Sequence, residues 1–143
     1  MKGRKRHVVV DTLGYVVKAF VTEANYYDGE VGTWLLAWLA EHCPRLHKIW
    51  ADGSYTGRFV ELAQTHYQIE VEITHPPTGQ KGFQVVPHRW VVERTFAWLN
   101  LYRRFYKDVE YHLHSADTMI YLAMSHLMLR RLARLRAATP STP

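Results

Sequence analysis

The stretch His47-Lys-Ile-Trp-Ala-Asp-Gly-Ser-Tyr55 and the residues that follow it decide the fold of this chain. The first five residues form a short apolar run that is typical of a buried strand. Residues 58–66 then have the spacing of a short helix, and residues 68–73 alternate polar and apolar, which indicates a strand with one solvent-exposed face. A strand, a helix and a second strand in this order predict parallel strands joined by a right-handed crossover.

The residues before this stretch predict a hairpin and a helix. Residues 7–11 and 15–21 are rich in β-branched side chains, and the glycine of Thr12-Leu13-Gly14 between them suits a turn. Residues 30–42 have helical spacing, and Pro44 ends that helix. An antiparallel hairpin beside parallel strands predicts the α/β class: a mixed sheet with helices on its faces.

The residues after this stretch predict a loop and two helices. Residues 76–83 hold two prolines and two glycines, as a loop would. Residues 88–108 contain neither glycine nor proline and read as one continuous helix. Ser115 can cap a last helix that runs to about residue 136, and residues 137–143 form a tail that we expect to be disordered. Residues 1–136 are therefore expected to form one domain.

The composition narrows the class of function. The net charge of the 143 residues is +5, and arginine and lysine cluster at both ends and in residues 89–107. Such clusters predict a polyanion partner, most plausibly nucleic acid, although solvated basic ends remain an alternative. Cys43 is the single cysteine, so no internal disulfide or thiolate zinc site can form. No apolar run is long enough to span a membrane, and we expect a cytoplasmic protein.

Two carboxylates, those of Asp52 and Glu93, lie at positions where they could bind a metal ion. Asp52 ends a strand, and ligands of open α/β sheets gather outside the carboxyl ends of strands. Glu93 lies on a mostly apolar helix, four residues after Arg89 and on the same face. Each has a plainer interpretation, because Asp-Gly is common in turns and Arg89–Glu93 is an ordinary helical ion pair. If they meet at one edge of the sheet, they suit Mg²⁺, which prefers hard oxygen ligands.

Three segments resemble the DDE transposases of bacterial insertion sequences. They are residues 2–14 (KGRKRHVVVDTLG), residues 50–57 (WADGSYTG) and residues 89–99 (RWVVERTFAWL). The resemblance implies an RNase H-like fold and an Asp-Asp-Glu triad that works with Mg²⁺ or Mn²⁺. Asp52 matches the second acid of the triad and Glu93 the last, so both are expected to be catalytic and to bind metal.

The first acid of the triad has no match in this chain. In these relatives it lies on a first, central strand that precedes the segment matching residues 2–11. We therefore expect this chain to lack that strand, which would lie between the opening hairpin and the strand that ends at Asp52. Asp11 ends a strand and is a tempting substitute, but it matches a second-strand aspartate and is expected to point away from the active edge.

The resemblance also implies that the partner is double-stranded DNA, both as the transposon ends and as the target. Arg89 and Glu93 match the family's signature around the last acid, while Val86 stands in place of its Tyr and Asn100 in place of its Lys. We expect DNA to be contacted by Arg89, Arg94, Arg103, Arg104 and Lys107.

Two functions follow as hypotheses. In the first, the chain is the C-terminal part of a transposase catalytic domain, inactive alone and completed by an upstream N-terminal polypeptide. In the second, it is a non-catalytic DNA-binding or regulatory remnant of a transposase. Unpaired strand edges would favour self-association, so a homo-oligomer is possible in either case.

Overall fold

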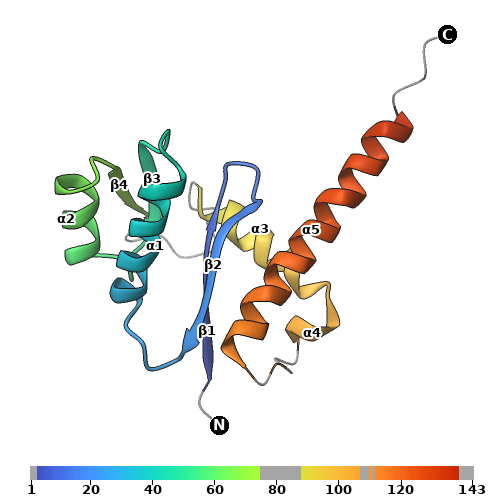
Figure 1. The fold of residues 1–143 in the computed structure, drawn as a ribbon, viewed down its shortest axis with the longest axis horizontal. Coiled ribbons are helices and arrows are strands. Elements are labelled where there is room, and N and C mark those ends of the chain that lie inside the picture. Colours follow the sequence, from blue (N-terminus) through green and yellow to red (C-terminus); the bar gives the residue numbers. More distant parts are fainter. Residues whose placement is uncertain (1–2, 75–87, 107–109, 111, 139–143) are drawn as a thin grey trace, which may run out of the picture.

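The protein is described here by a computed structural model that covers residues 3–74, 88–106, 110 and 112–138. It contains both helices and strands, which confirms the predicted α/β class. The predicted loop at residues 76–83, Val86, Lys107 and residues 139–143 lie outside the described residues. Figure 1 shows a central hairpin with one group of elements on each side of it.

The hairpin consists of β1 (Arg4–Val10) and β2 (Val16–Glu23), paired antiparallel as predicted. Gly14 adopts a φ of +85° in the turn, a conformation that favours glycine. The turn is tightened by the carboxylate of Asp11, whose Oδ1 accepts hydrogen bonds from the backbone N–H groups of Leu13 (2.9 Å) and Tyr15 (2.8 Å). β1 begins at Arg4, so Arg4, Lys5 and Arg6 belong to a strand.

The predicted strand–helix–strand unit is present. β3 (Lys48–Asp52) and β4 (Glu70–Thr74) pair in parallel, and α2 (Arg58–Thr65) connects them. The helix α1 (Asp28–His42) packs with α2 on the same side of the molecule (Figure 1). Glu70 and Glu72 are exposed and Val71 is buried, as the alternation of the sequence predicts.

The four described strands form two separate sheets, β1–β2 and β3–β4. The mixed sheet predicted from the order of elements is thus divided in the part of the chain that the structure describes. Each sheet has its own apolar cluster. Ala19, Leu99 and Ile120 lie in the first cluster, and Leu36, Phe59 and Val71 lie in the second.

The predicted helix at residues 88–108 is divided, and the prediction of one continuous helix is wrong. α3 (Arg89–Asn100) ends at Asn100, and α4 (Arg103–Tyr106) follows after a break. At the break, the N–H of Tyr102 donates to the carbonyl of Leu99 (3.0 Å), three residues back, which tightens the last turn. The new direction places Phe105 in the cluster beneath the hairpin, so burial of this ring accounts for the break.

The last helix, α5 (Leu113–Ala138), begins two residues before Ser115, which therefore is not its cap. It also includes residues 137 and 138, the first two of the tail predicted to be disordered, so that prediction is wrong for these two residues. Its first half packs against β2. The N–H groups of Ala19 and Val21 donate to the Tyr121 hydroxyl (2.9 Å) and to Asp117 (2.6 Å). No helix among the described residues combines the length and apolar character needed to cross a membrane.

Candidate active site

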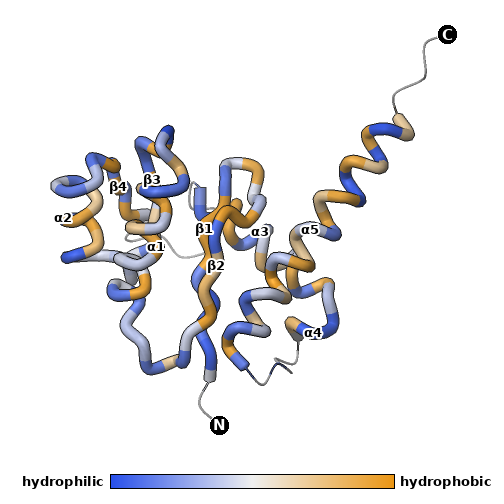
Figure 2. The backbone as a smooth tube through the Cα atoms, viewed as in Figure 1, coloured by the Kyte–Doolittle hydropathy of each residue, from blue (hydrophilic) through white to orange (hydrophobic). Residues whose placement is uncertain are grey.

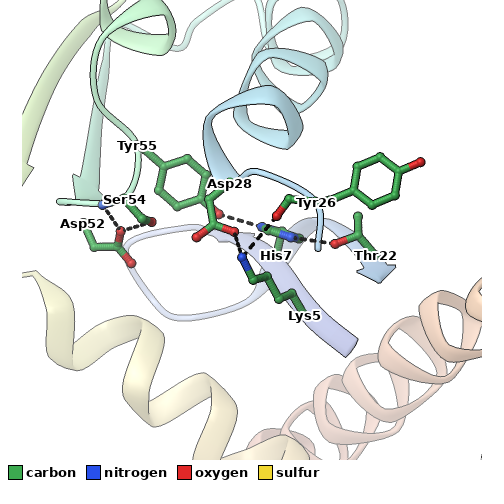
Figure 3. Close-up of polar contacts among 8 residues, drawn as sticks. All are labelled: Lys5, His7, Thr22, Tyr26, Asp28, Asp52, Ser54 and Tyr55. Atoms are coloured by element: carbon green, nitrogen blue, oxygen red, sulfur yellow. Dashed lines mark hydrogen bonds and ion pairs between the residues drawn. The ribbon is translucent and has the colours of Figure 1, made fainter. Parts of the chain in front are cut away.

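Asp52 is the last residue of β3 and is exposed. Its Oδ1 accepts a hydrogen bond from the backbone N–H of Ser54 (2.8 Å) and another from the Ser54 hydroxyl. The second carboxylate oxygen lies on the side away from Ser54 (Figure 3). Ser54 therefore fixes the orientation of the carboxylate through one oxygen, and the other oxygen lies on the opposite side of the group.

A depression of about 330 Å³ lies beside Asp52, between β1 and the loop that follows β3. β1 contributes cationic and imidazole side chains to its wall, α1 and the end of β3 each contribute an acid, and the loop after β3 contributes hydroxyls. The residues that line it are Lys5, Arg6, His7, Asp28, Asp52, Ser54 and Tyr55. The depression therefore lies at the junction of the two sheets.

A chain of hydrogen bonds joins the two sheets across this depression. The Nε2 of His7 lies 3.1 Å from the Thr22 hydroxyl on β2, and its Nδ1 lies 2.9 Å from the Tyr55 hydroxyl (Figure 3). Burial lowers the pKa of His7 and so keeps the imidazole neutral. Burial, with the nearby charges of Asp52 and Asp28, raises the pKa of Tyr55, which keeps its phenol protonated. The loop that follows Asp52 is thus held to the hairpin through neutral groups.

Asp28 lies in the first turn of α1 and forms an ion pair with Lys5, whose Nζ is 2.9 Å from its Oδ1. The same Nζ donates to the carbonyl of Tyr26 (3.1 Å). None of Asp28, Lys5, His7 and Tyr55 was predicted from the sequence as a site residue. The alternation of a strand places Lys5 and His7 on the same face, which is a signal in the sequence that they could act together. No such signal links them to Asp28, because Asp28 is distant in sequence.

Glu93 lies in the second turn of α3 and is paired with Arg89 at 3.1 Å, as the four-residue spacing predicted. The beginning of α3 contacts β3, because the ring of His88 stacks on Trp50 with 4.1 Å between centroids. Trp50 and Asp52 are two residues apart and both exposed, so they share the open face of β3. This contact brings the beginning of the Glu93 helix to the face of the strand that bears Asp52.

Arg94 lies within a stack of aromatic rings. Its guanidinium is 4.6 Å from the centroid of Trp90 and 4.8 Å from that of Trp98, and it donates to the carbonyl of Leu13 (2.8 Å). Arg131 covers Trp98 at 4.2 Å and donates to the Tyr15 hydroxyl (2.9 Å). These contacts join α3, α5 and the hairpin turn, so Arg94 holds the fold together at this point.

Arg103 and Arg104 are exposed on α4. Arg104 donates to Glu110 at 3.0 Å, and Arg89 is engaged with Glu93. Lys107 lies outside the described residues. Of the five side chains predicted to contact DNA, the structure thus places Arg89, Arg103 and Arg104 on exposed helical surface and Arg94 between rings.

Glu93 is not among the residues that line the depression beside Asp52, but both carboxylates are of the type that suits a hard cation. Asp52 and Glu93 offer carboxylate oxygens, the ligands that Mg²⁺ and Mn²⁺ prefer, and Mg²⁺ often binds to one or two carboxylates together with water and phosphate. No group of three or more His, Cys, Asp or Glu side chains that could hold a metal occurs within the described ranges.

Comparison with known proteins identifies the family. The chain matches the family model described as "Transposase DDE domain" over residues 1–128. It is 33% identical over 112 residues to a Burkholderia cepacia protein named "Putative transposase for insertion sequence element IS402", a match that covers 71% of this chain. The match covers 51% of that protein, so the chain spans about half the length of this relative. With a family match over most of its length, this chain belongs to the DDE-domain transposases.

Proposed function

We propose that this chain provides two of the metal-binding carboxylates with which a DDE transposase cleaves DNA strands and joins them to a target. The observation that carries the proposal is the position of Asp52 at the carboxyl end of β3, beside the depression, in a chain of this family. Bound Mg²⁺ or Mn²⁺ would supply activation of the attacking oxygen and stabilisation of the leaving 3′ oxygen.

Asp52 and Glu93 are held in place by different neighbouring side chains. Ser54 holds one oxygen of Asp52 and leaves the other for a ligand. Arg89 holds Glu93 in a bond that water can reach, so a cation could replace it at modest cost. The stack of His88 on Trp50 supports a meeting of the two carboxylates on the open face of β3.

The proposed partner is double-stranded DNA, bound through phosphates. Arg103 and Arg104 offer exposed guanidinium groups on α4, and Arg89 lies beside Glu93, where a phosphate could share the site. The contacts of Arg94 with Trp90 and Trp98 favour a structural role for it over the predicted contact with DNA.

The two separate sheets support an RNase H-like core that is completed by a further strand. β1 pairs with β2 and β3 pairs with β4, and the depression lies between β1 and the loop after β3. A strand inserted between β1 and β3 would join all the strands into one mixed sheet by pairing edge to edge. An acid at the end of that strand would lie beside Asp52 and complete the triad. We propose that an upstream polypeptide supplies it.

A second candidate function is a DNA-binding or regulatory remnant without catalysis. It is favoured by the lack, among the described residues, of a third acid grouped with candidate metal ligands. Asp11 does not provide one readily, because its Oδ1 is engaged by two backbone N–H groups of the hairpin turn.

Strand cleavage distinguishes these functions. A duplex carrying a transposon end is incubated with the chain and Mn²⁺, with and without a peptide that contains the proposed first strand and its aspartate. We expect cleavage only with the peptide, and a loss of at least about 100-fold on Asp52→Asn or Glu93→Gln, because even residues behind the metal ligands cost 10–100-fold.

The matched control is Asp11→Asn, which removes an acid from the turn and should leave peptide-dependent cleavage in place. Cleavage by the chain alone that Asp11→Asn abolishes would make Asp11 the first acid. DNA binding without cleavage under either condition would favour the remnant.

A further inference from the structure

The first strand, β1, changes in character along its length. Its first four residues are hydrophilic and its last three are valines (Figure 2). Successive side chains of a strand point to opposite faces, so Lys5 lies on the same face as His7, and Arg6 lies on the other face. Lys5 and Arg6 are the two cationic residues that line the depression beside Asp52.

The charged ends of these two cations point to different neighbours. The Nη2 of Arg6 donates to the carbonyl of Phe105 on α4 (3.4 Å), and its guanidinium lies 5.3 Å from the centroid of the Phe105 ring. The Nζ of Lys5 donates instead to Asp28 (2.9 Å) and to the carbonyl of Tyr26 (3.1 Å). Lys5 is therefore the one of the two whose charged end lies beside an acid of the depression (Figure 3).

The ammonium group of Lys5 can bind a further acceptor. A lysine ammonium has three N–H donors, and that of Lys5 donates to two acceptors among the described residues. The side chain of Lys5 is 39% exposed and that of Asp28 is 25% exposed, so solvent reaches the pair. The third N–H can therefore bind an oxygen that enters from solvent.

A DNA strand at this position needs such a cation. Asp28 and Asp52 both line the depression, so a strand that reaches Asp52 brings its phosphates close to two carboxylates. Like charges repel at short range, and lysine is a common phosphate ligand in proteins. The bond between Arg6 and Phe105 also joins α4 to the start of β1, so the exposed arginines of α4 lie in the same region of the molecule as Lys5.

We propose that Lys5 binds a backbone phosphate of the DNA strand that reaches Asp52, and that Asp28 competes with this phosphate for the ammonium group. The inference rests on the proposed function, because it takes DNA as the partner. Without DNA, Asp28 neutralises Lys5 and holds it at the depression. When a strand enters, the third N–H binds the phosphate, and the bond to Asp28 weakens because the two anions repel each other.

Fluorescence anisotropy of a labelled duplex, titrated with the full chain over a range of salt concentrations and without metal, tests the contact. Lys5→Met should lower the salt slope by about one and weaken binding about 5–10-fold at 0.1 M salt, the contribution of one phosphate contact. Lys5→Arg keeps the charge and should keep the slope. The matched control is Lys18→Met, which removes the same charge from the hairpin nearer its turn, where the ammonium lies over the rings of Phe20 and Trp38.

Asp28→Asn tests the competition, because it removes the charge of the competing acid and keeps its size. It should strengthen duplex binding about twofold to fivefold, which corresponds to the strength of a part-exposed ion pair. The gain should largely disappear in a Lys5→Met background. Glu30→Gln is the matched control, since it removes the same charge from an exposed position in the first turn of α1 and should have a smaller effect. Circular dichroism should show all these variants folded, because part-exposed ion pairs contribute little to stability.

The opposite signs of the two effects separate phosphate binding from a purely structural ion pair. An unchanged affinity and slope in Lys5→Met, or an equal effect of Lys18→Met, would overturn the proposal. Weaker binding in Asp28→Asn would also overturn it, since the pair would then only join β1 to α1. A folded chain that binds no duplex even at low salt would overturn the proposed DNA partner itself. The failure of this inference is thus distinguishable from the failure of the proposed function.

Discussion

The hairpin unit (β1, β2, α3, α4 and α5) and the crossover unit (α1, β3, α2 and β4) bury apolar residues in different ways. In the hairpin unit, a long helix covers β2 and its side chains accept the N–H bonds of that strand. In the crossover unit, α1 and α2 cover one face of the sheet and leave Trp50 and Asp52 on the other. The two apolar clusters share no residue.

The contacts between the two units include directional polar ones. His7 links Thr22 to Tyr55, Lys5 reaches Asp28, and the stack of His88 on Trp50 holds α3 to β3. Apolar packing depends mainly on buried area, whereas hydrogen bonds depend on the positions of both partners. We therefore expect the polar junction, where Asp52 lies, to set the geometry of the depression.

The largest expected effect tests whether the units are separable. Leu36→Ala should cost about 2–5 kcal/mol, because Leu36 is fully buried in the crossover unit. The matched variant Ile120→Ala removes a fully buried side chain of the hairpin unit. Amide hydrogen exchange should show Leu36→Ala lowering protection mainly in β4 and Ile120→Ala mainly in β2. An equal loss in both strands for either variant would mean that the units unfold as one.

A smaller effect is expected at the junction. Tyr55→Phe should cost about 1–3 kcal/mol in urea unfolding, since it leaves the Nδ1 of the buried His7 without its partner. Tyr67→Phe, at a half-buried tyrosine of the crossover unit, is the control and should cost less. If the two variants were equally stable, the hydrogen bond between His7 and Tyr55 would not hold the units together.

The same junction should respond to pH. Burial lowers the pKa of His7 below its ordinary value of 6.5, so below about pH 6.5 the unfolded chain binds a proton that the folded chain resists. The free energy of unfolding should therefore fall as the pH falls through 6.5 toward the lowered pKa. Unfolding at pH 7.5 and pH 5.5 measures the fall, and it should be smaller in His7→Gln. A fall of the same size in His7→Gln would assign it to other histidines.

Substitution of surface arginines should have the smallest effect on folding. It tests instead which of the two units binds DNA. Arg103→Ala with Arg104→Ala should reduce the salt slope of duplex binding by about one per lost phosphate contact. Arg45→Ala with Arg58→Ala removes the same charge from exposed positions of the crossover unit and should change the slope less. A larger change in the second pair would place the DNA on the crossover unit.

The sequence predicted helices and strands correctly where the local spacing of apolar and polar residues was sufficient. Alternation in residues 68–73 predicted β4, and the order of strand, helix and strand predicted its parallel pairing with β3. The glycine at position 14 predicted the hairpin turn. Each prediction required only neighbouring residues, because strands and helices have fixed periods.

The sequence failed where distant residues compete with a local pattern. The break after Asn100 follows from burial of Phe105 against the hairpin, and no glycine or proline announces it. Thr95 looks like an ordinary helical residue, yet it is fully buried and donates to the carbonyl of Gly14 (2.6 Å). Trp34 fits the apolar spacing of α1 but is 49% exposed, while Leu36 is buried in its place.

By itself, the sequence determined that Asp52 ends a strand and that Glu93 and Arg89 share a helical face, because both statements follow from spacing along the backbone. Only the tertiary structure decided that Asp28, Lys5 and His7 lie with Asp52 around one depression. It also decided that Arg94 is enclosed by Trp90 and Trp98. The physical reason is that contacts between distant residues depend on how whole elements pack, and local periodicity does not specify that packing.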